Sequence, residues 1–356
     1  GEPALSNVVV RLYNAASNVI GTTTSSVAGA YFFTNLLPGA YFVDFTPPAG
    51  YFFTVSNAGA DATDSDPLPG TNRTALVALV SGQTNLTVDA GFYRPASLGD
   101  FTWEDDDADG QQDGGEPALA NVAVRLYTAT SNLLATTTSS VAGAYAFTNL
   151  APGSYFVGFA PPAGYLFTTS NVGADATDSD PLPGTNRTAL VALVSGQAEA
   201  TLDAGFVRPA SLGDFTWVDA NGNGQQDGGE PALSNVVVRL YGAVSNVVGT
   251  TTSSVAGAYA FTNLFPGSYF VAFAPPAGYL FTAPNVGSDV SDSDPLAGTN
   301  RTSLVVLTNG QTDATVDAGF CSPGSIGNYT WVDSNFNGQQ DGGEPALANV
   351  VVRLYD

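Results

Sequence analysis

Apolar and polar residues alternate along most of the chain, which predicts short β-strands throughout. In the stretch 122–127 (VAVRLY) every second residue is Val or Leu, and the stretch 155–159 (YFVGF) alternates in the same way. A period of two is the pattern of a half-buried strand. Turn-forming residues interrupt the chain about every ten residues, and helical periodicity is missing. The pattern predicts an all-β sandwich of roughly seven to nine short strands with Greek-key connections.

The individual strands can be placed in the stretch from Ser97 to Pro209. The expected strands are Leu98–Trp103, 122–127, Leu133–Ser139, Tyr145–Leu150, 155–159, Gly164–Thr168, Thr188–Val194 and Thr201–Phe206. Asn171–Asn186 is expected to be an acidic loop, because Gly and Pro interrupt it repeatedly.

The same pattern returns every 114 residues. Trp103, Trp217 and Trp331 mark this period, and the last 14 residues nearly copy the first 14. A unit of this length can bury its own core, so we expect modules joined in series rather than a solenoid. The expected modules are 1–94, which lacks its first strand, 97–208, 211–322, and the N-terminal part of a further repeat at 325–356. Because the sequence opens and closes inside a repeat, we expect it to come from a longer array.

A loop that recurs three times fits the calcium loop of EF-hand proteins. In Asp219–Glu230 (DANGNGQQDGGE), oxygen-bearing side chains stand at positions 1, 3, 5 and 9, Gly stands at position 6 and Glu at position 12. Position 7 would offer its backbone carbonyl. The candidate ligands are Asp105, Asp107, Asp109, Gln111, Asp113 and Glu116; Asp219, Asn221, Asn223, Gln225, Asp227 and Glu230; and Asp333, Asn335, Asn337, Gln339, Asp341 and Glu344.

Asn, Asp and Gly also favour plain turns, which need no metal. Turn chemistry does not account for a Glu at position 12 together with acids at positions 1 and 9. In Asp105–Glu116 all five side-chain ligand positions are acidic, and charges so close repel one another without a cation. We therefore expect a divalent cation, calcium before any other. The helices that flank an EF-hand are missing, so the loop is expected to be carried on strands.

The charge of the chain is strongly negative and unevenly distributed. It has 32 acidic residues against nine arginines, no Lys and no His, for a net charge of −23. Phosphate contacts need Lys and Arg, so this composition argues against nucleic-acid binding. Of the 13 acidic residues between Gly99 and Leu212, ten lie in Glu104–Glu116 and Asp175–Asp180, which indicates cation sites rather than a solubilising coat. No apolar run approaches the roughly 20 residues that cross a bilayer.

The residue types exclude most enzyme chemistry. Without His or Lys, and with Cys321 as the single cysteine, neither a Ser-His or Cys-His pair nor a Schiff base can form. A carboxylate pair of the glycosidase type is possible in principle, but these acids fit the calcium template better. We therefore expect no enzyme. Cys321 is expected to be an unpaired surface thiol, with a link between chains as the alternative.

Longer motifs give the chain a specific resemblance. The strings LGDFTW, GAYAFTNL, PGSYFV, PPAGY, DATDSD and DAGF follow one another around the loop. Together they resemble the SdrD B-like repeat of bacterial surface and secreted proteins, which is related to the collagen-adhesin B-type module. The resemblance covers essentially the whole chain. It implies a calcium-binding sandwich, prealbumin-like or immunoglobulin-like, that serves as a stalk segment.

The resemblance also implies metal near the DSD motif. The matching residues are Asp61, Asp64 and Asp66; Asp175, Asp178 and Asp180; and Asp289, Asp292 and Asp294, with Asp89, Asp203 and Asp317 of the DAGF motif as further candidates. Related modules often carry a Lys–Asn or Lys–Asp isopeptide bond. This chain has no lysine and cannot form one, so core packing and metal must hold each module together.

The linkers between the expected modules are short and contain proline: Tyr93–Ala96, Val207–Ala210 and Ser322–Gly324. Such linkers leave little freedom. A first strand of about eight residues rises roughly 26 Å, so the calcium loop is expected at the far end of its module, near the junction with the next. The last strand is expected to end there as well. Calcium would then stiffen the joint; the alternative is that it stabilises only its own module.

These features predict an extracellular stalk or filament of calcium-stabilised repeats, whose partners are neighbouring repeats and other copies in a filament. The alternative is an adhesin, whose repeats present a separate binding domain or themselves bind a host or glycan ligand. The small variation between loops favours the spacer. A third possibility is that chains complete one another's repeats by strand donation. Asn72, Asn186 and Asn300 lie in Asn-Arg-Thr sequons and are candidate glycosylation sites.

Overall fold

The computed structural model describes residues 2–355, which form strands, turns and loops. No helix long and apolar enough to span a membrane occurs among these residues. The chain divides into two compact units. The first comprises the residues up to Ala210 together with Asn263–Gly267 and Leu307–Gln311, and the second comprises Ser211–Thr262, Ser268–Val306 and the residues from Thr312 onward. The predicted all-β class is confirmed.

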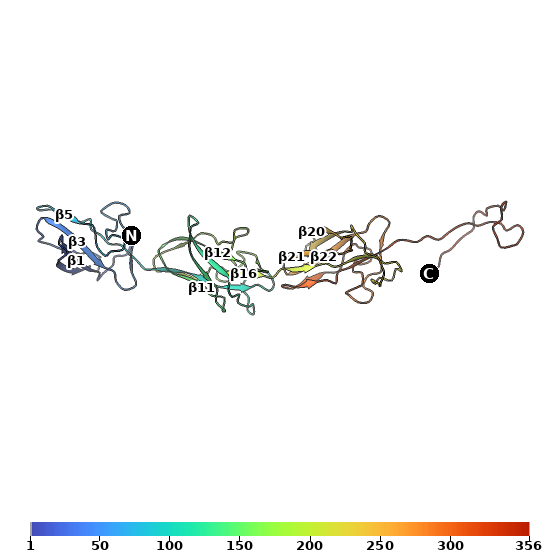
Figure 1. Ribbon diagram of the computed structural model, residues 1–356, viewed down its shortest axis with the longest axis horizontal. Coiled ribbons are helices and arrows are strands. Elements are labelled where there is room, and N and C mark those ends of the chain that lie inside the picture. The colour runs from blue at the N-terminus through green and yellow to red at the C-terminus, as the bar shows by residue number, and fades with distance from the viewer. Residues whose placement is uncertain (1, 356) are drawn as a thin grey trace. The chain divides into compact units, whose positions relative to one another are not determined.

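The first unit opens with a four-stranded sheet in the order β2-β1-β3-β5. Figure 1 labels β1, β3 and β5 of this sheet. Its strands are β1 (Val9–Asn14), β2 (Val19–Thr24), β3 (Gly39–Thr46) and β5 (Val77–Leu79). A separate ribbon pairs β4 (Phe52–Phe53) with β6 (Phe92–Tyr93). Because strand residues alternate between faces, β1 buries Val10 and Leu12 and places Arg11 on the opposite face of the sheet.

The same unit then repeats the four-stranded sheet as β10-β9-β12-β14 and adds the sheets β11-β7-β15 and β13-β16-β8. The strands are β7 (Ala96–Asp100), β8 (Thr102–Glu104), β9 (Ala123–Thr128), β10 (Leu133–Thr138), β11 (Tyr145–Leu150), β12 (Gly153–Ala160), β13 (Leu166–Phe167), β14 (Val191–Leu193), β15 (Ala198–Glu199) and β16 (Ala204–Val207). Two pairings are parallel, β7 with β15 and β8 with β16.

The later strands have the same sheet orders, β20-β19-β22-β24, β21-β17-β25 and β18-β26-β23. They are β17 (Ala210–Leu212), β18 (Thr216–Val218), β19 (Val237–Gly242), β20 (Val247–Thr252), β21 (Phe261–Leu264), β22 (Gly267–Ala274), β23 (Leu280–Phe281), β24 (Val305–Leu307), β25 (Thr312–Asp313) and β26 (Ala318–Cys321). In the second unit β18 pairs with β26 in parallel, as β8 does with β16 in the first. Between Ser322 and Tyr355 only the isolated bridge Trp331–Ala346 is formed.

Alternate side chains of the strands build the core of the stretch 96–206. Val124, Leu126 and Val157 have no exposed surface, and each such side chain contributes about 1.5–3 kcal/mol of hydrophobic stabilisation. Trp103 is also completely buried, and it packs on Gly205. A Cβ at Gly205 would lie 2.6 Å from the Trp103 ring, which explains the Gly of the DAGF motif.

The predicted strands are largely confirmed, with two differences. The stretch Leu98–Trp103 forms two strands, because Phe101 between them donates its N–H to the Asp203 carboxylate (2.9 Å) instead of to a neighbouring strand. The strand β15 is too short to show the alternation of apolar and polar residues from which a strand is predicted. The stretch therefore has ten strands, from β7 to β16, rather than seven to nine. The predicted direction of the last strand is confirmed by the parallel pairing of β16 with β8.

Candidate metal centre

The loop Asp105–Glu116 follows directly on β8 and folds around the side chain of its first residue. Asp105 Oδ1 accepts a hydrogen bond from Ala108 N (2.6 Å), and Oδ2 accepts bonds from Gly110 N (2.8 Å) and Thr168 Oγ1 (2.5 Å). Asp105 is completely buried. The N–H groups of the loop thus turn the backbone around a central carboxylate, as the calcium template requires of position 1.

Glu116 closes this loop. Its Oε1 accepts a hydrogen bond from Asp106 N (2.8 Å) and its Oε2 accepts one from Asp113 N (2.9 Å). Carboxylate oxygens of Asp105, Asp107 and Glu116 lie within 4.8 Å of one another, and so do those of Asp107, Asp109 and Asp113. Burial raises the pKa of Glu116, and the charges of Asp105 and Asp107 act in the same direction. The predicted side-chain ligands of this loop therefore converge.

The loop Asp219–Glu230 has the same internal bonds. Asp219 accepts hydrogen bonds from Gly222 N and Gly224 N (2.7 Å each), and Glu230 Oε1 accepts one from Ala220 N (2.8 Å). Burial alone would raise the pKa of Asp219, but hydrogen bonds from Thr282 and from the loop N–H groups hold that pKa below its ordinary value. Asp219 is therefore prepared to carry a negative charge inside the fold.

The amides of this loop also turn inward. Asn221 Nδ2 and Asn223 Nδ2 both donate to Asp227 Oδ2, at 2.9 and 2.8 Å. In Asp333–Glu344 the same contacts recur: Asn335 and Asn337 donate to Asp341 (2.8 and 2.6 Å), and Glu344 Oε1 accepts from Ser334 N (2.8 Å). The carbonyl ligands assigned to Gln111, Gln225 and Gln339 stay a prediction.

Position 6 of each loop requires glycine. Gly224 has a φ of +82°, and a Cβ there would lie 2.4 Å from the carbonyl oxygen of Ala283. We expect Gly224→Ala to destabilise the fold by about 1–3 kcal/mol, because neither the backbone angle nor the carbonyl can adapt cheaply. Urea unfolding followed by tryptophan fluorescence would measure the loss. Gly228→Ala is the matched control, since a Cβ at Gly228 meets nothing within 4 Å. Equal effects of the two substitutions would contradict the tight turn.

The acidic DSD loops lie directly against the calcium loops. Gln112 N donates to Thr177 O (2.7 Å), and Gln111 forms a β-bridge with Asp178. In the second unit Gln226 N donates to Ser291 O (2.8 Å). The two candidate regions, far apart in the sequence, therefore form one continuous acidic region.

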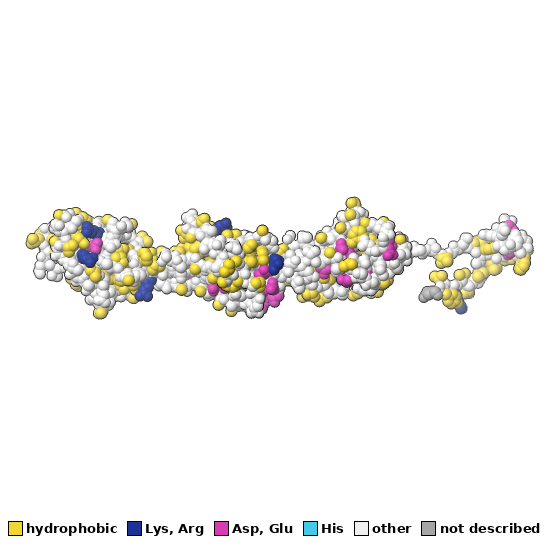
Figure 2. Space-filling model, turned by 60° about the horizontal axis from the view of Figure 1, so that its bottom comes forward, with side chains coloured by type: hydrophobic (Ala, Val, Ile, Leu, Met, Phe, Trp, Pro, Cys, Tyr) yellow, Lys and Arg dark blue, Asp and Glu magenta, His cyan; other side chains and the backbone are white. Residues whose placement is uncertain are grey.

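Within the DSD loop the acids gather around the DAGF aspartate. Carboxylate oxygens of Asp175, Asp178 and Asp180 lie within 4.8 Å of one another. Asp203 N donates to Asp180 Oδ2 (2.6 Å), and Asp203 Oδ1 accepts from Phe101 N (2.9 Å). Asp289, Asp292 and Asp294 form the corresponding cluster beside Asp317. On the face shown in Figure 2, acidic side chains likewise gather in a few places instead of spreading over the surface.

Some carboxylate oxygens in these clusters are buried and have no partner. Asp203 Oδ2 and Asp178 Oδ1 make no hydrogen bond within the described residues, although Asp203 is only 1% exposed. Asp317 Oδ2 and Asp292 Oδ1 repeat this arrangement. Burying an acceptor without a partner is costly, and burying a charge costs more. These orphaned oxygens fit a group that supplies positive charge.

The pKa values follow from this burial. Burial, reinforced by the charge of Asp100, raises the pKa of Asp203 to about 8. Burial likewise raises the pKa of Asp180 to about 7. In the second unit the pKa of Asp317 is raised to about 8 and that of Asp294 to about 7, again mainly by burial. The fold without a cation therefore disfavours the charged forms of these acids.

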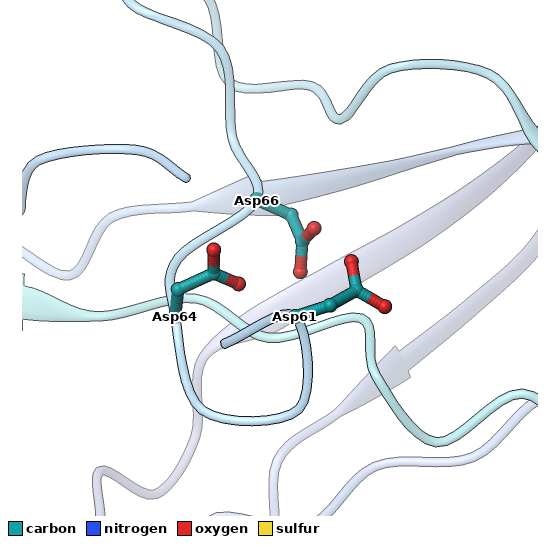
Figure 3. Close-up of side chains that lie close together, drawn as sticks. All are labelled: Asp61, Asp64 and Asp66. Atoms are coloured by element: carbon teal, nitrogen blue, oxygen red, sulfur yellow. The ribbon is translucent and has the colours of Figure 1, made fainter. Parts of the chain in front are cut away.

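The first repeat contains the DSD cluster as well. Asp61, Asp64 and Asp66 project from one turn toward a common region (Figure 3), and their carboxylate oxygens lie within 4.8 Å of one another. Asp89 N donates to Asp66 Oδ2 (2.6 Å), and Asp64 Oδ1 is buried without a partner in the part of the chain that is described. Burial raises the pKa values of Asp66 and Asp89.

Sequence reasoning missed a polar network next to the first loop. Glu104 accepts hydrogen bonds from Arg208 Nε (2.5 Å), Tyr165 Oη (2.9 Å) and Asn309 Nδ2 (2.5 Å), and it also forms an ion pair with Arg208. Asn309, in a segment that belongs to the first unit, donates further to Asp106 Oδ1 (2.9 Å). The corresponding residues Val218 and Val332 carry no charge. Asn309 likewise stands where the earlier repeats have Ser81 and Ser195, and these differences between repeats are the signal of the network in the sequence.

The remaining candidates lie away from these clusters. Asn72, Asn186 and Asn300 are exposed, while the threonines of their sequons, Thr74, Thr188 and Thr302, are buried. Glycosylation stays a prediction. Cys321 is a half-buried free thiol at the end of β26, and a link between chains through it also stays a prediction.

Known proteins similar to this chain identify its family. The SdrD B-like domain profile matches residues 1–92, 96–206 and 210–320. The chain is 36% identical over 364 residues to a serine-aspartate repeat-containing protein F of Staphylococcus epidermidis, and 36% identical over 363 residues to a serine-aspartate repeat-containing protein D of Staphylococcus aureus. These alignments cover 100% of the chain but only 22% and 26% of the two relatives. The BcpA major pilin subunit of Bacillus cereus aligns over 90% of the chain and 96% of its own, at 10% identity and a TM-score of 0.31.

The family match agrees with the motifs on which the resemblance rests. Its three matched stretches follow the 114-residue period and cover most of the chain. The matched stretches are structural repeats and not an enzyme. The chain belongs to the SdrD B-like domain family.

Proposed function

We propose that the chain is a segment of an extracellular stalk whose repeats are stabilised by bound calcium. The observation that carries this proposal is the set of buried, unpartnered carboxylate oxygens of Asp178, Asp203, Asp292 and Asp317. Each lies in a group of acids whose charges need neutralisation. The repeats of this stalk would be 1–94, 97–208, 211–322 and 325–356, with neighbouring repeats and other copies of the chain as partners.

The donors that the fold gathers suit a hard cation. They are carboxylate, amide and carbonyl oxygens, the ligands that calcium prefers, and sulfur or imidazole ligands are not among them. Asp105, Asp107, Asp109, Asp113 and Glu116 would hold one ion in the first loop. Asp175, Asp178, Asp180 and Asp203 would hold a second in the DSD cluster. Their equivalents in the later loops and in the first repeat would act in the same way.

Bound calcium would supply positive charge to acids that the fold has already buried. Because the calcium loop and the DSD loop are joined through Gln112 and Thr177, charge neutralisation at either one stabilises the other. A ligand that binds the folded state and not the unfolded state raises stability by mass action. Calcium would thus replace the isopeptide bond that a chain without lysine cannot form.

Two of the three linkers are held as well, which suits a stalk. Arg94 N donates to Ser195 Oγ (2.8 Å), and Gly196 N donates to the carbonyl of Arg94 (2.9 Å). Arg208 N makes the corresponding bond to Asn309 Oδ1 (2.7 Å). Asn309 also contacts Asp106 of the calcium loop, so loop and linker share one network. This supports the expectation that calcium stiffens the joint as well as the repeat.

Two further observations support a spacer. The repeats differ little in sequence, which a passive spacer tolerates and a dedicated binding module does not need. The serine-aspartate repeat-containing relatives are several times longer than this chain, which is consistent with an array inside a larger surface protein. A role in ligand binding is favoured by one specific observation: Arg239 and Arg301 make no ion pair within the described residues 2–355.

Small-angle X-ray scattering of the full chain tests the stalk. In calcium we expect the scattering of a stiff array, and in a chelator we expect a broader distribution of dimensions at unchanged strand content. Glu104→Val, which copies Val218, should broaden the distribution even in calcium, because it removes the acceptor shared by Arg208, Tyr165 and Asn309. Charged hydrogen bonds of this kind contribute about 1.5–3 kcal/mol each when buried, and less here because Arg208 is half exposed.

Glu199→Gln is the control for this measurement. Glu199 lies in the same repeat, and within residues 2–355 its carboxylate accepts hydrogen bonds only from Gln197 and Thr201. Its replacement should leave the scattering unchanged. Identical curves with and without calcium, at every variant, would refute a calcium-stiffened stalk while leaving the family assignment intact.

A further inference from the structure

A row of three residues crosses the outer face of each four-stranded sheet, and it differs among the repeats in one informative way. In the first repeat Arg11 stands opposite Asp44 on the neighbouring strand, and Asp44 is bridged on its other side to Arg73. In the second the row is Arg125–Gly158–Arg187, and in the third it is Arg239–Ala272–Arg301. The two arginines are kept while the middle residue loses its charge.

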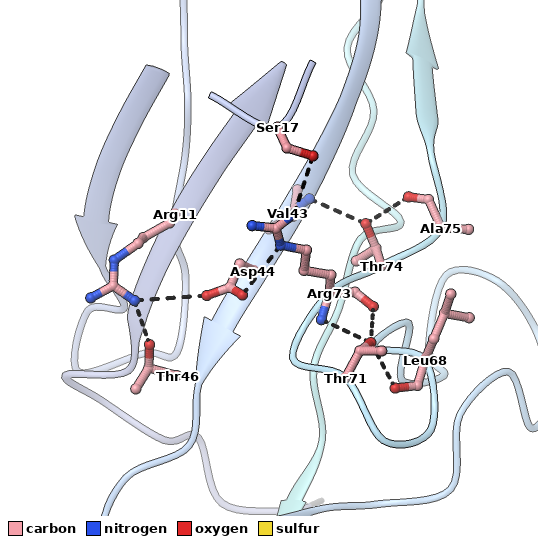
Figure 4. Close-up of polar contacts among 10 residues, drawn as sticks. All are labelled: Arg11, Ser17, Val43, Asp44, Thr46, Leu68, Thr71, Arg73, Thr74 and Ala75. Carbon is pink, nitrogen blue, oxygen red and sulfur yellow. Dashed lines mark hydrogen bonds and ion pairs between the residues drawn. The ribbon is translucent and has the colours of Figure 1, made fainter. Parts of the chain in front are cut away.

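In the first repeat the middle carboxylate neutralises both arginines. Asp44 Oδ1 lies 3.7 Å from Arg11 Nη1, and its Oδ2 lies 3.8 Å from Arg73 Nε (Figure 4). Arg11 also donates to Thr46 Oγ1 (2.8 Å). This row shows that the spacing of the two arginines on the sheet accommodates one carboxylate between them.

The third repeat lacks counterparts of both Asp44 and Thr46, the two residues that contact Arg11 in the first repeat. Ala272 replaces Asp44 and Ala274 replaces Thr46. Arg239 is exposed and makes no ion pair within residues 2–355. Arg301 stacks on the Tyr241 ring, 4.2 Å from its centroid, and reaches Ser245 Oγ only at 3.5 Å. Two guanidinium groups therefore flank a position from which the carboxylate is missing.

That position is a hollow. A space of about 470 Å³ opens over Ala272 and Ala274, between Arg239, Arg301 and the backbone of Gly298–Asn300. The volume is in the range of small-ligand pockets and larger than a carboxylate alone would fill.

We propose that the Arg239–Ala272–Arg301 row binds the carboxylate of an acidic sugar of the uronic acid class. The two arginines would take the carboxylate, as they take Asp44 in the first repeat, through charge-assisted hydrogen bonds. The ring would lie over Ala272 and Ala274, with Thr299, Asn300 and the adjacent backbone available to its hydroxyl groups. A compact ring suits an open hollow on a sheet face better than an extended peptide, which would pair along a strand edge.

The net charge of −23 does not rule this out. At physiological ionic strength charges farther away than about 8 Å are largely screened, so the adjacent arginine pair dominates at the site. Binding of one carboxylate at an open site is weak, with a dissociation constant on the order of 1 mM. Repetition along an array would raise the affinity for a polymer of such sugars.

The test compares glucuronate with glucose, which lacks the carboxylate, on the full chain at fixed calcium and ionic strength. Arginine Nε–Hε signals are followed by ¹⁵N NMR, and single Arg→Gln variants assign them. We expect saturable shifts of Arg239 and Arg301 with glucuronate and none with glucose. Arg11 and Arg73, already neutralised by Asp44, should not shift and serve as the internal control.

Ala272→Asp is the decisive variant, because it copies the residue that the first repeat has at this position. It should weaken glucuronate binding at Arg239 and Arg301 at least about tenfold without lowering the thermal midpoint. Asp44→Ala should create the reverse change at Arg11 and Arg73. Equal responses to the two sugars, shifts at all nine arginines alike, or unchanged binding in Ala272→Asp would each overturn the proposal. Self-association that Ala272→Asp abolishes, with no glucuronate response, would replace the sugar by an acidic loop of a second copy.

Discussion

Removing calcium with a chelator lowers the thermal unfolding midpoint of the chain by about 10–20 °C. A site held at one hundred times its dissociation constant stabilises the fold by about 2.7 kcal/mol, and each kcal/mol shifts the midpoint of a domain of roughly this size by about 4–8 °C. The physical reason is the burial of acids such as Asp203 and Asp317, whose charges lack a partner without the cation. Differential scanning calorimetry in excess calcium and in excess chelator measures the shift.

The first repeat provides a comparison inside the same molecule. It contains the cluster of Asp61, Asp64 and Asp66 but only Glu2 of the calcium loop motif. We expect the calorimetric transition of this repeat to shift less than those of the repeats that have both regions. Magnesium, which demands a tighter octahedral arrangement, should restore less stability than calcium. A thermal unfolding midpoint that does not change on chelation would contradict the proposal that calcium stabilises the repeats.

Replacing Asp317 with Asn should change stability in opposite directions with and without calcium. Without a cation, the substitution removes a buried charge. It keeps an acceptor for Phe215 N, which in the wild type donates a hydrogen bond to Asp317 Oδ1 (2.9 Å). The fold should gain on the order of 1–3 kcal/mol near pH 8. With calcium, the loss of an anionic ligand should weaken binding roughly tenfold or more. Chelator and calcium series of urea unfolding curves measure both effects.

The pH dependence of the same variant has a defined sign. The pKa of Asp317 is about 8 in the fold, above its ordinary value of 3.8, so the protonated carboxyl favours folding. Its contribution is fully present below pH 3.8 and is lost as the pH rises to about 8. The metal-free wild type should therefore lose stability across this range, and Asp317→Asn should lose less. Asp313→Asn removes one charge outside the buried cluster and is the control. A parallel decline in all three chains would be evidence against the buried carboxylate as its cause.

Local patterns predict the strands and the convergence of the loop carboxylates well. The alternation in VAVRLY predicts β9 because residues two apart share a face, and this rule needs no knowledge of the rest of the fold. The loop template likewise predicts that Asp105 and Glu116 converge, because its ligands lie within one short turn. Both successes concern residues that are close in sequence.

The features that the sequence does not reveal all depend on distant contacts. The break at Phe101 is set by Asp203, which lies 102 residues away. The contact between Gln112 and Thr177 merges two regions that appear separate in the sequence. Glu104 accepts hydrogen bonds from Arg208 and Asn309 only because the fold brings their segments together. Periodicity and spacing carry no information about such pairs.

The parallel pairing of β8 with β16 has a mechanical consequence. β8 lies near the start of its repeat and β16 at the end, so tension on the two ends of the repeat pulls these neighbouring strands along their length in opposite directions. The force then acts in shear on all the hydrogen bonds between the two strands together, and these bonds do not break one after another. A repeat built in this way resists traction applied through the backbone, and a molecule that tethers a surface against flow experiences traction of that kind.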